Sequence, residues 1–358
     1  MDACKQKFLA LDALRGVGAI MVVLAHIVGY EQINWLFTNA SPGVDLFFVL
    51  SGFVIAHCYE PGLQTTLTYR RYVRTRMIRL YPTIILGGLA GAVAALLVAG
   101  HNDRVEIWQA LPLQLLLIPL FSAAFDCYPL NPATWSLFFE LVANFAHGAC
   151  AKHVTKGRLV AVIAASFVAL VLCAFYFGSL NVGAQPNNFV GGFVRVGFSF
   201  TLGLLLYRLH ASGRLRVPKL SIFVPVFGII AMMVLPAPDI PYGAAIHDLV
   251  CVVLVVPALI LLAVNADVPH RWERILAWLG IMSYPLYALH IPILKVFGEP
   301  IVTPGLPHWI KAVGWAGVVC ITVMVATFVA YRIDAPIRAW LSKRRSASPK
   351  PTLGLKSA

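Results

Sequence analysis

Apolar segments of similar length follow one another along nearly the whole chain, and short polar gaps separate them. A helix needs about 17–25 mostly apolar residues to cross the hydrocarbon core of a membrane. The pattern therefore predicts an all-α protein, a polytopic bundle of membrane helices. The segments that meet or approach the required length are 9–29, 43–59, 80–99, 108–125, 133–151, 158–178, 189–209, 219–236, 243–264, 276–297 and 309–332.

The segment 108–125 is the poorest candidate for crossing, because it holds two prolines and two glutamines. If it crosses, the basic gaps at 152–158 and 208–219 lie on the opposite side of the membrane from the arginine-rich stretch 60–80. If it is re-entrant or interfacial, all three lie on one side together with both termini, as the positive-inside rule favours. We therefore predict about ten transmembrane helices, one re-entrant or interfacial segment near 108–125, and both termini in the cytoplasm.

The composition supports a membrane protein. The chain is 59% hydrophobic and only 12% charged, whereas soluble domains contain about 25% charged residues. The net charge of +13 lies mainly in the gaps, so it is interpreted as orienting the chain in the lipid bilayer and not as a nucleic-acid site. The seven cysteines are scattered without a C-x-x-C pair, which indicates neither a disulfide framework nor a metal site. We expect one membrane domain over 1–340 and a disordered, basic cytoplasmic tail over 341–358.

The first apolar segment carries a stripe of ionisable residues, Asp12, Arg15 and His26. At about 100° per residue, Arg15 and His26 lie within about 20° of each other on a helix. Ionisable groups inside a membrane are costly and mark functional sites by default. Asp45 opens the next segment at a matching depth, so we predict that its carboxylate orients His26 as a general base. The alternatives are that Arg15 extends to the membrane surface, that His26 only joins two helices, and that Asp45 only caps its helix.

Further charged residues lie in and between later segments. Arginines cluster just before the third segment, and Arg71 and Arg74 are predicted to bind a phosphorylated cytosolic ligand, unless they serve only orientation and lipid headgroups. Glu140 and Arg195 enter the membrane from the same side, which makes Arg195 a candidate partner for this buried carboxylate. His290 is a second intramembrane histidine, with helix packing as its alternative role.

Together, these features resemble the acyltransferase 3 family, membrane-bound O-acyltransferases of bacterial surface polysaccharides, over about 8–340. The motifs that carry the resemblance, in the family's order, are Leu11-Asp12-Ala13-Leu14-Arg15-Gly16 with His26, Gly43-Val44-Asp45-Leu46-Phe47-Phe48-Val49-Leu50-Ser51-Gly52-Phe53, Arg71-x-x-Arg74 and Arg76-x-x-Arg79 before Tyr81-Pro82, Trp135-Ser136-Leu137 with Glu140, and Ser283-Tyr284 through His290. One departure is Asp334-Ala335-Pro336, where the family often has Glu. That difference leaves the role of Asp334 open.

The resemblance implies transfer of an acyl group, in most cases acetyl, from cytosolic acyl-CoA to a hydroxyl of an extracytoplasmic or lipid-linked sugar. It implies a multi-pass protein of the bacterial inner membrane, with acetyl-CoA as donor substrate and no permanently bound cofactor or metal. Direct transfer and an acyl-histidine intermediate both fit. The residues expected in the site are His26, Asp45 and Glu140 for catalysis, Arg15, Arg71 and Arg74 for the donor, and Arg195, Tyr284 and His290 for the acceptor.

Two other classes of function use the same intramembrane charges. The first is a transporter or flippase for a sugar or an anion, although the internal repeats that many transporters carry are not evident in the sequence. The second is an inactive relative that acts as a membrane sensor or scaffold. Release of CoA that depends on an acceptor would distinguish the enzyme from both.

Overall fold

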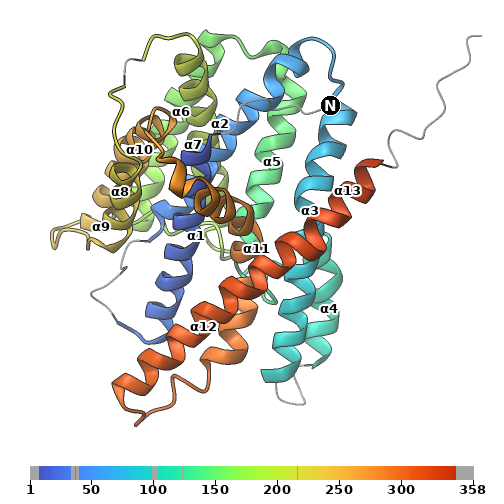
Figure 1. Ribbon diagram of the computed structural model, residues 1–358, viewed down its shortest axis with the longest axis vertical. Coiled ribbons are helices and arrows are strands. Elements are labelled where there is room, and N and C mark those ends of the chain that lie inside the picture. Colours follow the sequence, from blue (N-terminus) through green and yellow to red (C-terminus); the bar gives the residue numbers. More distant parts are fainter. Residues whose placement is uncertain are drawn as a thin grey trace, which may run out of the picture.

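The computed structural model describes residues 8–33, 37, 40–98, 104–122, 125–215 and 217–343. Apart from an isolated bridge between Ser221 and Asp267, the regular structure of these residues is helical, which confirms the all-α bundle (Figure 1). The helices are α1 (Leu9–Tyr30), α2 (Pro42–Gln64), α3 (Tyr69–Val98), α4 (Arg104–Leu115), α5 (Thr134–Cys150), η2 (Ala151–His153), α6 (Lys156–Phe177), α7 (Phe189–Ala211), α8 (Phe223–Val234), α9 (Gly243–Val250), η3 (Cys251–Val255), α10 (Val256–Val264), η4 (His270–Trp272), α11 (Glu273–Gly298), α12 (His308–Phe328), η5 (Val329–Asp334) and α13 (Ala335–Lys343).

Eight helical segments in the described part of the chain are long and apolar enough to cross a membrane. The chain is therefore a polytopic membrane protein. The remaining two predicted spans form shorter helices, α5 with 17 residues and α8 with 12 residues. The eight segments are Leu9–Tyr30, Pro42–Gln64, Tyr69–Val98, Lys156–Phe177, Phe189–Ala211, Gly243–Val264, His270–Gly298 and His308–Lys343.

The segment predicted not to cross contains α4, which has only 12 residues. At about 1.5 Å per residue it is about 18 Å long, and the hydrocarbon core of a bilayer is about 30 Å thick. The helix ends before Leu117, whose φ of 57° is left-handed, and it packs beside α3 (Figure 1). This short helix agrees with a re-entrant or interfacial segment.

Close packing of α1 against α11 positions the first functional groups. A Cβ added to Gly16 would lie 2.5 Å from the Cβ of Leu279, and one added to Gly280 would lie 2.5 Å from the Cβ of Asp12. Side chains larger than hydrogen are therefore excluded at both crossing points. The two helices run in the same direction, since Arg15 meets Ser283 near their starts and His26 meets His290 further along.

Helices α2 and α7 approach one another closely as well, and they run in the same direction. A Cβ on Gly203 would lie only 2.1 Å from the carbonyl oxygen of Val49. This approach brings Asp45, near the start of α2, to Arg195 on α7, and Glu60, near the end of α2, to Arg208. The α2–α7 contact thus fixes the ion pairs at both ends of α2.

Candidate active site

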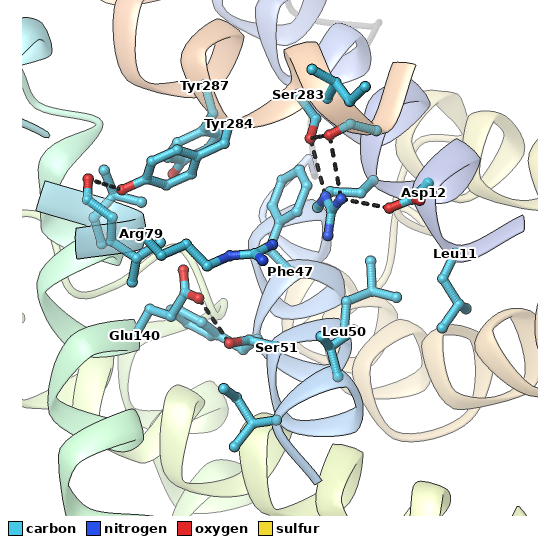
Figure 2. Close-up of a pocket in the computed structure, with 18 of the residues that line it drawn as sticks. Leu11, Asp12, Phe47, Leu50, Ser51, Arg79, Glu140, Ser283, Tyr284 and Tyr287 are labelled. Atoms are coloured by element: carbon cyan, nitrogen blue, oxygen red, sulfur yellow. Dashed lines mark hydrogen bonds and ion pairs between the residues drawn. The ribbon is translucent and has the colours of Figure 1, made fainter. Parts of the chain in front are cut away.

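A cavity of about 460 Å³ lies between α1, α2, α3, α5 and α11 (Figure 2). It extends from Phe8 and Leu9, where α1 begins, to Val44 and Tyr287, deeper in the bundle. The long α12–η5–α13 helix also contributes, because Asp334 and Arg338 line the cavity. This arrangement forms a deep pocket that begins at one end of the bundle.

The most constrained arginine of the cavity is Arg15. Its guanidinium donates to Asp12 Oδ1 at 2.6 Å, to Ser283 Oγ at 3.1 Å and to the carbonyl oxygen of Gly280 at 3.3 Å (Figure 2). These bonds follow directly from the close contact between α1 and α11. Arg15, a predicted donor-site residue, thus lies in the wall of the cavity, and its partners on α11 were not predicted from the sequence.

Two other arginines of the cavity have unused hydrogen-bonding capacity. Arg76 is only 4% exposed, its Nη2 atom is 3.6 Å from Glu140 Oε1, and its buried Nε has no hydrogen-bond partner in the described part of the chain. Arg79 extends into the pocket (Figure 2) and makes no hydrogen bond or ion pair among the described residues. Arg76 is buried, whereas Arg79 is exposed to the cavity. The forked donors of a guanidinium bind carboxylates and phosphates well, so Arg76 and Arg79 are suited to binding an anion in the cavity.

Arg71 and Arg74 lie on an exposed part of α3 and do not line this cavity. On a helix, positions separated by three, four and seven residues share one face. Tyr72, Arg76 and Arg79 are such a set, so Arg71 and Arg74 point elsewhere. The arginine cluster was recognised from the sequence, but the arginines selected from it belong to the wrong face for this pocket.

The predicted pairing of Asp45 with His26 is wrong. Both oxygens of Asp45 are already engaged: Oδ2 accepts from Arg195 at 2.7 and 3.1 Å, and Oδ1 accepts from Ser199 at 2.8 Å. Asp45 is fully buried, so it requires a compensating cation, and α7 supplies one across the α2–α7 contact. His26 has no carboxylate partner among the described residues.

Arg195 is fully buried, and all three nitrogens of its guanidinium donate hydrogen bonds. Beyond Asp45, it donates to the carbonyl oxygens of Ser41 and Val182 at 2.9 and 3.0 Å, and its guanidinium lies 5.3 Å from the ring of Trp135. The predicted partnership of Arg195 with Glu140 is therefore also wrong. Arg195 joins α2, α7 and the loop after α6, and it has little capacity left for a ligand.

Glu140 lines the cavity and is held by two other groups (Figure 2). Ser51 Oγ donates to its Oε1 at 2.8 Å, and Arg76 lies on the same oxygen. Neither Ser51 nor Arg76 was selected as a site residue from the sequence. Both lie in the motifs that resemble the family, but their contacts with Glu140 depend on how α2, α3 and α5 pack.

His26 and His290 form a pair, with ring centroids 4.9 Å apart. The Nδ1 atom of His26 lies 2.8 Å from the carbonyl oxygen of Val22, and that of His290 lies 2.7 Å from the carbonyl oxygen of Tyr287. A carbonyl only accepts, so each Nδ1 donates and each neutral ring keeps a lone pair on Nε2. His26 is accessible, whereas His290 is fully buried and its Nε2 has no hydrogen-bond partner within the residues that the structure describes.

Tyr284 and Tyr287 lie on the wall of α11 that faces the cavity (Figure 2). Tyr284 donates to the carbonyl oxygen of Leu80 at 3.0 Å, so it joins α11 to α3. The hydroxyl of Tyr287 lies 2.6 Å from Ser136 Oγ. Among the described residues, no group of three or more His, Cys, Asp or Glu side chains is arranged to hold a metal ion.

Comparison with known proteins identifies the class. The acyltransferase 3 family model, described as an acyltransferase domain, matches residues 8–332. The chain therefore belongs to the acyltransferase 3 family, and it is a membrane acyltransferase. It is also similar to a curated protein of Rhizobium radiobacter described as protein 2 in the picA locus, with 35% identity over 193 residues, which is 48% of this chain and 97% of that protein. No solved structure matches the chain significantly.

Proposed function

We propose that this enzyme transfers an acyl group, acetyl in the simplest case, from acyl-CoA to a hydroxyl of an extracytoplasmic or lipid-linked sugar. The observation that carries the proposal is Arg79, which makes no hydrogen bond or ion pair among the described residues and extends with Arg76 into a deep cavity. CoA carries several phosphate groups, and arginine forks are well suited to phosphate oxygens.

The donor enters from the cytoplasm in this proposal. The cavity begins where α1 begins, and the positive-inside rule favours a cytoplasmic location for that end and for both termini. The membrane is proposed to be the bacterial inner membrane. Arg71 and Arg74 lie exposed on the first turns of α3, so they are proposed to contact CoA phosphates that remain outside the pocket. The thioester end then points inward past Arg15 and Glu140.

The acceptor is activated by His26 at the other end of the site. Its Nε2 lone pair takes the proton of the acceptor hydroxyl, the oxygen attacks the thioester carbonyl, and the C–S bond breaks to release CoA, whose sulfur receives the proton. In the alternative, His26 Nε2 itself attacks the thioester carbonyl and CoA leaves. The acceptor hydroxyl then takes the acyl group from the acyl-histidine intermediate. Glu140 contributes to the donor site, and His290 and Tyr284 belong to the path between the two ends. Asp45 and Arg195 are proposed to position α2 and α7.

The proposal is tested by mass spectrometry of surface glycans from cells that lack the gene and carry either the wild-type protein or His26→Ala. The wild-type protein is expected to restore acylated sugar, and His26→Ala is expected to restore none at equal abundance in the membrane. Full acylation with His26→Ala would exclude His26 as the base. The absence of any sugar acylation with the wild-type protein would exclude this acceptor class.

A further inference from the structure

We propose that Phe47 and Tyr287 form an aromatic partition between the arginine-lined cavity and the histidine pair, and that this partition restricts the transferred acyl group to short chains. The inference rests on the proposed function, because it assumes that the cavity holds the acyl donor. It adds a specificity-determining pair to that function.

The partition lies where the cavity ends. Phe47 and Tyr287 both line the cavity, whereas neither histidine does. Their rings pack edge to face with centroids 5.5 Å apart. The Tyr287 ring also contacts His290, at 5.6 Å between centroids, and His290 in turn contacts His26. Tyr287 therefore separates the pocket from the histidines.

The distance between the end of the cavity and His26 is about one helical turn of α1. Val44, in the first turn of α2, lines the pocket. Its neighbour Gly43 packs against α1 at Val22, since a Cβ there would lie 3.7 Å from Val22 Cγ2. Val22 is the residue whose carbonyl receives the hydrogen bond of His26 one turn further on. Only a small group has to pass the partition to reach His26.

Both rings of the partition are held in place. The Tyr287 hydroxyl is hydrogen-bonded to Ser136 at 2.6 Å. Phe47 packs against α1 at Gly18, where an added Cβ would lie 3.5 Å from the Phe47 Cζ atom. Groups that are packed closely on several sides resist displacement, so the space at the end of the cavity is fixed by the two rings.

The consequence is discrimination by chain length. In a fitted apolar pocket, one extra methylene changes binding by about 10- to 200-fold. An acetyl thioester adds a single methyl beyond its carbonyl, whereas a longer chain has to displace Phe47 or Tyr287. The partition therefore favours acetyl over longer acyl groups on the same CoA.

The test measures binding, because binding needs no acceptor. Acetyl-CoA, butyryl-CoA and octanoyl-CoA are titrated calorimetrically into the purified full-length protein in lipid nanodiscs. Wild type is expected to bind acetyl-CoA most tightly. Phe47→Ala is expected to raise the affinity for octanoyl-CoA relative to acetyl-CoA by at least about tenfold. Phe138→Ala is the matched control, because Phe138 is equally half-buried but does not line the cavity.

The same ratio of affinities in wild type, Phe47→Ala and Phe138→Ala would overturn the inference. If Phe47→Ala does not fold, Phe47→Leu is expected to move the ratio in the same direction by a smaller factor, and an unchanged ratio there is equally contradictory. A wild-type protein that binds none of the three thioesters would instead contradict the proposed function, so the two failures are distinguishable.

Discussion

Arg195 and Arg79 are both arginines within the helical bundle, yet their surroundings differ completely. Arg195 is fully buried and is held by Asp45, two backbone carbonyls and the ring of Trp135. Arg79 lines a cavity, makes no hydrogen bond or ion pair among the described residues, and has Arg15, Arg76 and Arg338 as cationic neighbours. The first environment uses a charge to join helices, whereas the second leaves a charge available to a ligand.

The largest expected effect on stability comes from breaking the buried ion pair between Asp45 and Arg195. Asp45→Asn leaves the buried guanidinium of Arg195 without its counter-charge, which typically costs about 3–5 kcal/mol. We expect a large fall in the thermal midpoint of the purified protein in detergent, and little protein in the membrane. The double variant Asp45→Leu, Arg195→Met replaces both charges by apolar groups and is expected to recover much of this loss. A thermal midpoint for Asp45→Asn equal to that of wild type would show that the pair does not hold α2 to α7.

A smaller effect is expected at Ser51, which lines the cavity and lies on the same helix, α2, as Asp45. Ser51→Ala removes the hydrogen bond to Glu140 and is expected to lower the free energy of unfolding by about 1 kcal/mol. The thermal midpoint should fall slightly and the acetyl-CoA affinity only moderately, since Arg76 still contacts Glu140. Ser41→Ala is a suitable comparison, because it also removes one serine hydrogen bond, from Ser41 Oγ to Leu180 O, away from the cavity. A loss of acetyl-CoA affinity equally large in both variants would indicate a general distortion of the bundle.

The smallest effect on stability is expected at Arg79. Arg15, Arg76 and Arg338 are cationic neighbours of Arg79. Glu140 and Asp334 also line the cavity, but Arg79 makes no ion pair among the described residues, so Arg79→Gln removes repulsion without breaking an ion pair. We expect the thermal midpoint of the ligand-free protein to remain unchanged or to rise slightly. A drop as large as that of Asp45→Asn would mean that Arg79 is a structural cation, and it would remove the contrast with Arg195.

Features that depend on a single helix could be predicted from the sequence. Lengths of apolar segments predicted the membrane bundle, and the prolines and glutamines of 108–125 indicated correctly that this part is a poor span. The stripe of Asp12, Arg15 and His26 also follows from helical periodicity alone. His26 and His290 were both selected, although their contact was not, because it depends on α1 and α11 running side by side.

Partners between helices could not be derived in the same way. From the sequence, Asp45 was predicted to pair with His26 because both lie at a similar depth in the membrane. In the structure α2 packs against α7, and Asp45 therefore forms its ion pair with Arg195. Similarly, five arginines lie within ten residues at the start of α3, and which of them face a cavity depends on the rotation of α3 against its neighbours. Depth in the membrane can be read from the chain, whereas neighbours around each helix depend on packing between distant segments.

The central claim is that Arg79 and its surroundings bind the acyl donor. Calorimetric titration of acetyl-CoA into wild type, Arg79→Gln and the control Arg158→Gln tests it most directly. A charge-assisted hydrogen bond contributes about 1.5–3 kcal/mol, so Arg79→Gln is expected to weaken binding by about 10- to 100-fold. Arg158, exposed at the start of α6 and outside the cavity, should have no effect. Equal affinity of Arg79→Gln and wild type for acetyl-CoA would contradict the account.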